Sequence, residues 1–249
     1  MTIVSVHQPN FMPWLKLLDK ILASDVYIAY DTAQYTRSEF HSRQKIKMSS
    51  GPDWLTVPLR SPGTSAIKDV RIATDQPLRE RHLHRITLAY RRCPYFDEVF
   101  PVLERVYRRD HEWLVELNLD LISSICDYLG SEVRIVRASE LAHTGDRMQR
   151  LVQLLEGAGS SVHLTSTIGT EHDYMDPEVF HAAGIELRAQ RFDHPVYGQP
   201  YGSFVPDLAA IDMLFCCGRE TARILASRRE FVTVATQSRD TDRVRSGSG

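Results

Sequence analysis

The sequence lacks the features that would assign it to a membrane, secreted or nucleic-acid-binding class. No apolar run approaches the roughly 20 residues that a membrane-spanning helix needs, and no charged and apolar leader precedes the first predicted strand. The 30 basic and 32 acidic residues give a formal net charge of −2, so no global field attracts the protein to nucleic acid or anionic membranes. We therefore expect a cytoplasmic protein that does not associate with a membrane.

Cysteine is also scarce, and its spacing indicates neither a metal site nor a disulfide framework. The chain has four cysteines and no Cys-x-x-Cys pair. Cys216 and Cys217 fall at the C-terminal end of a predicted helix, where the helix dipole opposes a thiolate. We predict structural thiols and transfer chemistry without a covalent enzyme intermediate. No set of metal ligands stands out, and no cofactor is predicted.

What the sequence contains is the pattern of an α/β protein. Hydrophobic residues make up 43% of the chain and charged residues 25%, which are ordinary values for a globular protein. A strand over residues 2–6, a polar turn over 7–10, a helix over 14–22 and a strand over 26–30 follow the order of a βαβ unit. That order favours a parallel pair of strands.

The rest of the chain continues this alternation, with one helical interruption. Hydrophobic periodicity predicts a hairpin over 44–59, a strand near 70–72, a helical region over 77–129, and then strands over 133–136, 163–166 and 185–191 separated by helices. A last helix over 208–214 leads into a helical tail. We predict an α/β fold with a mostly parallel sheet, flanking helices and a helical lobe around 77–129. One domain spans 1–236, and the Gly/Ser-rich segment 237–249 is expected to be disordered.

The first predicted turn gathers polar groups at the edge where parallel sheets bind ligands. His7 follows the first strand at its carboxyl end, with Gln8 and Asn10 beside it and a helix N-terminus beyond. Asp31 occupies the matching end of the second strand. If the two strands are adjacent, its carboxylate can orient the His7 imidazole; the alternative is that Asp31 caps the following turn.

Basic side chains alternate along the first strand of the predicted hairpin. A period of two places Arg43, Lys45 and Lys47 on one face of that strand. Such a face is either solvated or a clamp for phosphate groups, which suits the bidentate fork of arginine.

A second group of polar residues lies near the end of the chain. His194, Tyr197 and Gln199 fall on a loop after a predicted strand, again at a carboxyl edge. We predict that His194 and His7 approach one pocket; two unrelated loop histidines are the alternative. Asp207 begins the last helix, and Asp212 lies within its apolar stripe, where a charged side chain is usually paired.

Taken in order, these segments resemble the WbqC-like family. The similarity runs from His7 to about Gly218 and so covers nearly the whole chain. Its main segments are His7-Gln8-Pro9-Asn10-Phe11-Met12-Pro13-Trp14-Leu15, Asp19-Lys20-Ile21, Asp31 with Gln34-Tyr35, Ser42-Arg43-Gln44-Lys45-Ile46-Lys47, Trp54-Leu55-Thr56-Val57-Pro58, His194-Pro195-Val196-Tyr197-Gly198-Gln199, Phe204-Val205-Pro206-Asp207-Leu208 and Ile211-Asp212-Met213-Leu214-Phe215.

The resemblance implies a transferase of polysaccharide or natural-product biosynthesis that forms an amide bond. The donor would be an activated aminoacyl group, glycyl among the candidates, carried as a carrier-protein thioester or an aminoacyl-tRNA. The acceptor would be a small-molecule amine on a sugar nucleotide or metabolite. An ATP-dependent ligase or nucleotidyltransferase of the class I synthetase-like kind and a non-catalytic ligand-binding module are the alternatives.

Under the transferase hypothesis each candidate residue has a role. His7 is the general base, Asp31 positions it, and His194 is a second base or proton shuttle. Gln8, Asn10 and Tyr197 hydrogen-bond the donor carbonyl, and Arg43 and Lys45 hold a phosphate-bearing part of a substrate. The predicted substrate-binding set is completed by Tyr35, Gln199, Asp207 and Asp212.

Overall fold

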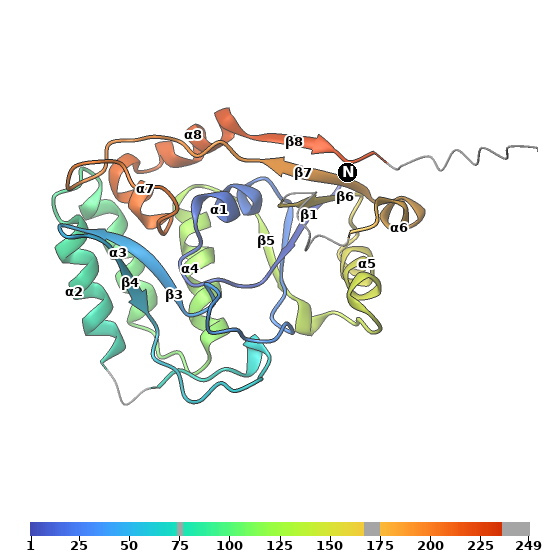
Figure 1. Cartoon of the computed structure of the whole chain (residues 1–249), viewed down its shortest axis with the longest axis horizontal. Helices are drawn as coiled ribbons and strands as arrows, with labels where there is room; N and C mark the ends of the chain where they lie inside the picture. The colour runs from blue at the N-terminus through green and yellow to red at the C-terminus, as the bar shows by residue number, and fades with distance from the viewer. Residues whose placement is uncertain (74–76, 167–174, 236–249) are drawn as a thin grey trace, which may run out of the picture.

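The computed structural model describes residues 1–73, 77–166 and 175–235 (Figure 1). The opening segment forms the predicted βαβ unit, which consists of β1 (Ile3–His7), α1 (Leu15–Leu22) and β2 (Val26–Ala29). β1 and β2 are parallel, and Val4 pairs with Val26 in the register. His7 is the last residue of β1, so it stands at the carboxyl edge of the sheet.

Six strands of the described chain form one sheet in the order β5-β2-β1-β6-β7-β8. Every neighbouring pair is parallel except the last, in which β8 runs antiparallel to β7. The strands not yet given are β5 (Arg134–Arg137), β6 (Val162–Thr165), β7 (Glu186–Arg191) and β8 (Glu230–Thr233). The predicted α/β fold with a mostly parallel sheet is confirmed.

Two apolar cores cover the two faces of the sheet. Successive strand residues point to opposite faces, so Tyr27 of β2 joins the larger core with α1, whereas Val26 and Ile28 join the smaller one. The smaller core is covered by α5 (Arg147–Gly157) and α6 (Pro177–Ala182), and the larger core includes α7 (Ile211–Cys217) and α8 (Glu220–Arg228).

The larger core extends into a helical lobe beside the sheet, on the left in Figure 1. Its helices are α2 (Leu78–Tyr90), α3 (Phe96–Tyr107) and α4 (Leu114–Tyr128), within the predicted region 77–129. The separate antiparallel hairpin of β3 (Arg43–Met48) and β4 (Gly51–Thr56) packs against this lobe. None of the described helices is both long and apolar enough to cross a membrane.

Three predicted elements differ from the structure. Residues 70–72 form isolated bridges to Leu59 and Trp113 rather than a strand. The last apolar helix begins at Ile211 instead of Leu208, because Ala209 forms an isolated bridge with Trp14 and its N–H donates to the Lys45 carbonyl at 2.8 Å. β8 stands where only a helical tail was predicted, because four residues are too few to show a strand period. The tail 237–249 lies outside the described residues.

Candidate functional site

The carboxyl edge of β1 is the point at which the chain changes its direction of travel across the sheet. From β1 the chain adds β2 and then β5 on one side, and it later adds β6 and β7 on the other. Doubly wound sheets bind ligands in the crevice at such a point. A pocket of about 530 Å³ lies there, and the described residues that line it include His7, Lys20, Tyr30, Arg147, His163 and Ser166.

His7 presents a neutral imidazole to this pocket. Its Nδ1 lies 2.9 Å from the backbone carbonyl oxygen of Gln8, and because a carbonyl only accepts, Nδ1 carries the proton. The Nε2 atom of the neutral ring therefore has a lone pair, and no described residue hydrogen-bonds to it. Burial, together with the positive charge of Lys20, lowers the pKa of His7 to about 3. At physiological pH the ring is a hydrogen-bond acceptor.

Lys20 brings a positive charge into the same pocket from α1. Its side chain is only 2% exposed, and its Nζ donates to Oγ of Ser166 at 2.8 Å, just after the end of β6. The neighbouring Asp19 accepts instead from Nε of Arg229 at 2.9 Å, which ties α1 to the segment after α8. Helix α1 thus directs Lys20 toward the pocket and Asp19 away from it.

His163 and Arg147 complete the polar part of the described lining. His163 lies within β6, where its Nδ1 is 3.2 Å from the carbonyl oxygen of Val4 and its ring stacks on Phe180. Burial and the charge of Lys20 lower the pKa of His163 to about 4. Arg147 is exposed at the start of α5. Neutral imidazoles beside cations suit the binding of an anionic or carbonyl oxygen.

The turn between His7 and α1 is buried and strained. Met12 is fully buried and has a φ of 44°. Residues other than glycine rarely adopt this left-handed conformation, and they keep it only where the surrounding structure holds them in place. The Phe11 N–H donates to the Phe40 carbonyl at 3.0 Å, and Asn118 Nδ2 donates to the Pro9 carbonyl at 2.8 Å. These contacts fix the turn and therefore the place of His7, and such strain concentrates at functional sites.

The other candidates near the start of the chain are less available. Gln8 lines the pocket, but its Oε1 accepts from Nε2 of His41 at 3.0 Å, since the other His41 ring nitrogen accepts a backbone N–H. Asn10 is buried, and its Oδ1 has no hydrogen-bond partner among the described residues. Tyr35 is also buried, and its hydroxyl shares a 2.9 Å hydrogen bond with Ser42. Of the three, the structure brings only Gln8 to the pocket.

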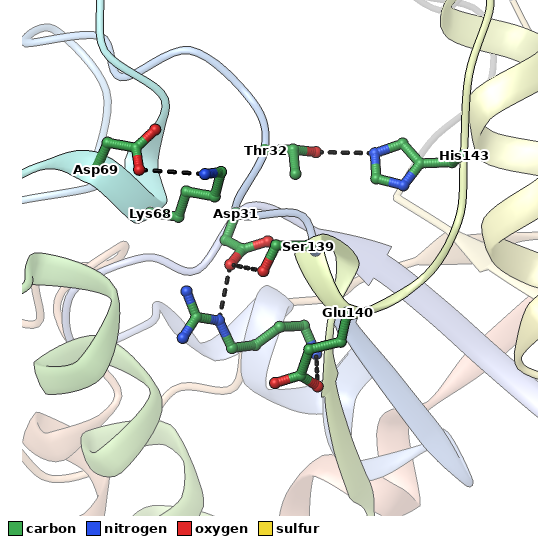
Figure 2. Close-up of polar contacts among 8 residues, drawn as sticks. Asp31, Thr32, Lys68, Asp69, Ser139, Glu140 and His143 are labelled. Carbon is green, nitrogen blue, oxygen red and sulfur yellow. Dashed lines mark hydrogen bonds and ion pairs between the residues drawn. The ribbon is translucent and has the colours of Figure 1, made fainter.

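The structure does not bring Asp31 to His7. Figure 2 shows its carboxylate beside Ser139, whose backbone N–H and hydroxyl donate at 2.9 and 2.8 Å. Nε of Arg137 donates to the same carboxylate at 2.8 Å. These donors belong to the end of β5 and the 3-10 turn η2 (Ala138–Glu140), on the side of β2 away from β1. Asp31 therefore joins β2 to β5, and the predicted orienting contact with the imidazole is absent among the described residues.

His194 has both ring nitrogens occupied on the loop after β7. Its Nδ1 donates to the Pro195 carbonyl at 2.9 Å, and its Nε2 accepts the Asp207 N–H at 3.4 Å. The ring packs edge-on against Phe204. His194 is not among the described residues that line the His7 pocket, because β6 separates β7 from β1. Within the described chain the two histidines do not share the predicted pocket.

Half-buried Tyr197 and Gln199 form a hydrogen-bonded group with the buried residues Asp212, Tyr90 and Lys47, here called the Asp212 cluster. The Asp212 carboxylate accepts from Tyr197 at 2.8 Å, from Gln199 at 2.9 Å and from Tyr90 at 3.0 Å. Lys47 Nζ donates to Oε1 of Gln199 at 3.1 Å. Burial raises the pKa of Asp212, and its hydrogen-bond donors oppose that shift. The pairing predicted for a charge in an apolar helix is present.

The three basic side chains of β3 have two different surroundings. Lys47 is 1% exposed within the Asp212 cluster. Arg43 and Lys45 remain half-exposed over Trp54 of β4, with Arg43 Cζ 4.4 Å and Lys45 Nζ 5.1 Å from the centroid of the ring. Two of the three cations therefore stay open to a ligand.

Lys20, His163 and Ser166 line the pocket but were not predicted as site residues from the sequence. A signal existed for the first two. Lys20 precedes Ile21 on the buried stripe of an amphipathic helix, and His163 interrupts an apolar strand. A titratable side chain at a buried position needs a partner or a function.

Comparison with known proteins agrees with the resemblance seen in the sequence. The WbqC-like protein family matches residues 8–224. The chain is also 29% identical over 232 residues to the uncharacterized protein Rv1507c of Mycobacterium tuberculosis, across 91% of this chain and 99% of that protein. No solved structure matches the chain. Because the family match spans most of the sequence, the chain belongs to the WbqC-like protein family.

Proposed function

We propose that the chain is an aminoacyl transferase that joins an activated aminoacyl group, such as glycyl, to an amine. The observation that carries this proposal is the juxtaposition of the neutral His7 imidazole and the buried Lys20 ammonium in one pocket. A base for the amine and a cation for the carbonyl oxygen are the two groups that acyl transfer needs. The pocket volume of about 530 Å³ is that of a small-molecule site.

In this reaction the amine nitrogen attacks the donor carbonyl carbon. Nε2 of His7 takes the amine proton as the carbon–nitrogen bond forms, and Lys20 stabilises the oxyanion of the tetrahedral intermediate. The carbon–sulfur or ester carbon–oxygen bond then breaks, and the imidazolium returns its proton to the leaving group. The oxyanion offsets the Lys20 charge that lowers the pKa of His7, so the imidazole becomes a stronger base as the reaction proceeds.

The donor is a carrier-protein thioester or an aminoacyl-tRNA ester, and the acceptor is a small-molecule amine. In this proposal Asp31 does not orient His7 and His194 is not a second base, because Asp31 bonds to Arg137 and both ring nitrogens of His194 have partners. His7 therefore acts without the carboxylate partner and without the second base that the sequence suggested.

A second candidate, an ATP-dependent ligase or nucleotidyltransferase, is favoured by one observation. Counted alone in chain order, the five parallel strands have the order 3-2-1-4-5, that of nucleotide-binding doubly wound sheets. A fold does not fix a reaction, so this candidate rests on analogy. Exchange of labelled pyrophosphate into ATP in the presence of amino acids separates the two, because the transferase catalyses no such exchange.

The test of the proposal uses the glycyl thioester of N-acetylcysteamine with a panel of amino sugars and small amines. We expect amide products by mass spectrometry, and His7→Gln lowers kcat/KM about 10²- to 10⁴-fold, the usual contribution of a general base. His84→Gln, an exposed histidine on α2, is the matched control and keeps its activity. Absence of amide from every acceptor, or an unchanged rate in His7→Gln, contradicts the proposal.

A further inference from the structure

A continuous group of aromatic and basic side chains lies beside the His7 pocket. It consists of Trp14, Phe40, Trp54, Arg43 and Lys45, here called the aromatic–cationic surface, and all five are half-buried. The ring centroids of Trp14 and Phe40 are 5.1 Å apart, and those of Phe40 and Trp54 are 6.2 Å apart. Both cations lie over the Trp54 ring. The rings thus form a row that ends in two positive charges.

The other end of this row touches the candidate base. The Trp14 ring meets the His7 ring edge-on, with 5.7 Å between their centroids. Backbone contacts hold the row in place, because Trp14 pairs with Ala209, and the Ala209 N–H donates to the Lys45 carbonyl at 2.8 Å. A ligand laid along the rings therefore has one end at the cations and the other at His7.

Arg43 has hydrogen-bonding capacity that the chain does not use. Its Nη2 donates to the Ser38 carbonyl at 3.1 Å, while its Nε is buried with no hydrogen-bond partner among the described residues. The guanidinium is half-exposed, and its Nη1 hydrogen-bonds to no described residue, so this nitrogen can donate to an anion. The guanidinium lies over Trp54, an arrangement on which a planar base also stacks.

We propose that the aromatic–cationic surface binds the nucleoside diphosphate portion of a substrate. The base stacks on the aromatic and guanidinium planes, and Arg43 and Lys45 hold the phosphates. The group attached to the diphosphate then reaches His7. This placement at His7 rests on the proposed transferase function, whereas the binding of the diphosphate does not.

A small nucleotide fits these features better than a longer nucleic acid. Two cations match the two phosphates of one diphosphate, whereas a polynucleotide is held along an extended basic groove. The net charge of −2 also gives no long-range attraction to a polyanion. The surface therefore binds an acceptor substrate that carries a nucleotide. Binding of an RNA donor is the alternative that the experiment below tests.

Calorimetric titration with UDP and ADP tests the proposal, beside uridine, adenosine, pyrophosphate and a single-stranded RNA ending in CCA. We expect one of the diphosphates to bind more tightly than its nucleoside and than pyrophosphate. Trp54→Leu weakens binding at least about fivefold through lost stacking, and Trp54→Phe restores most of it. The Arg43→Gln/Lys45→Gln variant loses about tenfold or more, and Arg91→Gln, exposed at the end of α2, is unchanged.

Tryptophan fluorescence locates the site. The chain has three tryptophans, so Trp113→Phe leaves only Trp14 and Trp54, and the diphosphate quenches this variant. Circular dichroism melting shows that each variant is folded. Absence of binding by both diphosphates, full binding by the Trp54→Leu and Arg43→Gln/Lys45→Gln variants, or tighter binding of the RNA overturns the proposal. His7→Gln keeps its affinity for the diphosphate, so a failure of the transferase proposal leaves a result distinct from a failure of this one.

Discussion

The His7 pocket and the Asp212 cluster contain similar side chains in opposite arrangements. Each holds a nearly fully buried lysine, Lys20 at 2% and Lys47 at 1% exposure, close to other titratable groups. In the Asp212 cluster the carboxylate and Lys47 have hydrogen-bond partners within the chain. In the pocket Lys20 and His7 line a cavity, and Nε2 of His7 bonds to no described residue.

This difference separates polar groups that hold the fold from polar groups that are available to a ligand. Burial costs free energy in both places, and hydrogen bonds within the chain offset it in the Asp212 cluster. In the pocket Lys20 donates to Ser166, and a substrate can supply a partner for Nε2 of His7. Burial and perturbed pKa values alone do not distinguish the two regions, whereas an adjoining cavity does.

The largest effect on stability is expected from Asp212→Ala. Loss of the carboxylate leaves the hydroxyl groups of Tyr90 and Tyr197 without an acceptor and removes one of the acceptors of Gln199, and breaking a buried charged network costs about 3–5 kcal/mol. Asp212→Asn keeps an acceptor and loses less than half of that amount. Urea denaturation measures both. Equal losses in the two variants, or a loss under about 1 kcal/mol in Asp212→Ala, would show that the network does not hold the fold.

Lys20→Met is expected to lower activity without lowering stability, which is the reverse of the effect expected of Asp212→Ala. It removes the cation beside the donor carbonyl, which lowers kcat/KM in the glycyl thioester assay about 10²- to 10³-fold. The melting temperature stays equal or rises, because methionine fills the space without a buried charge. A stability loss as large as that of Asp212→Ala, with activity kept, would place Lys20 with the structural lysines.

The two regions are also expected to respond to pH with opposite signs. The pKa of His163 is lowered to about 4, so between its ordinary value of 6.5 and about 4 the unfolded chain binds the proton and the folded chain does not. Stability from His163 is complete above pH 6.5 and falls by up to about 1.4 kcal/mol per pH unit below it. The pKa of Asp212 is raised, so its ionisation destabilises the fold as pH rises.

Urea denaturation of the wild type, His163→Asn and Asp212→Asn between about pH 4.5 and pH 7.5 checks these signs. The advantage of the wild type over His163→Asn shrinks toward acid pH, and its advantage over Asp212→Asn grows. Parallel stability curves for all three proteins would contradict the lowered pKa of His163 and the raised pKa of Asp212.

The smallest effect is expected from the Cys216→Ala/Cys217→Ala double variant. Burial raises the pKa of the Cys217 thiol, and a hydrogen bond with Cys93 together with burial raises that of Cys216. Both stay protonated, so the variant keeps most of its activity. A donor acyl group attached to either sulfur, detected in the intact mass of the wild type, would show that the reaction passes through a cysteine and would contradict direct transfer in the His7 pocket.

The sequence predicted the architecture well where periodicity is strong. The βαβ opening, the helical lobe and the place of His7 follow from patterns that span many residues. β8 has only four residues, and the last helix starts late because Ala209 bridges to Trp14, a contact between segments far apart in the sequence.

The site was harder to predict because strand order is not written in local patterns. Asp31 and His7 do end adjacent parallel strands, but β5 lies on the far side of β2 and supplies the donors that hold Asp31. β6 returns to the other side of β1 and brings His163 and Ser166 to the pocket. Only the order of the strands shows which edge residues meet.

The tautomer of His7, read from the ring nitrogens by NMR of selectively labelled wild-type protein, tests most directly whether His7 is a general base. We expect a neutral ring with the proton on Nδ1 and a lone pair on Nε2 throughout about pH 6 to 8, since Nδ1 faces the Gln8 carbonyl and the pKa of His7 is lowered to about 3. Addition of an amine acceptor then shifts the Nε2 resonance. A ring that is protonated on Nε2, or that titrates near 6.5, contradicts a general base at this position.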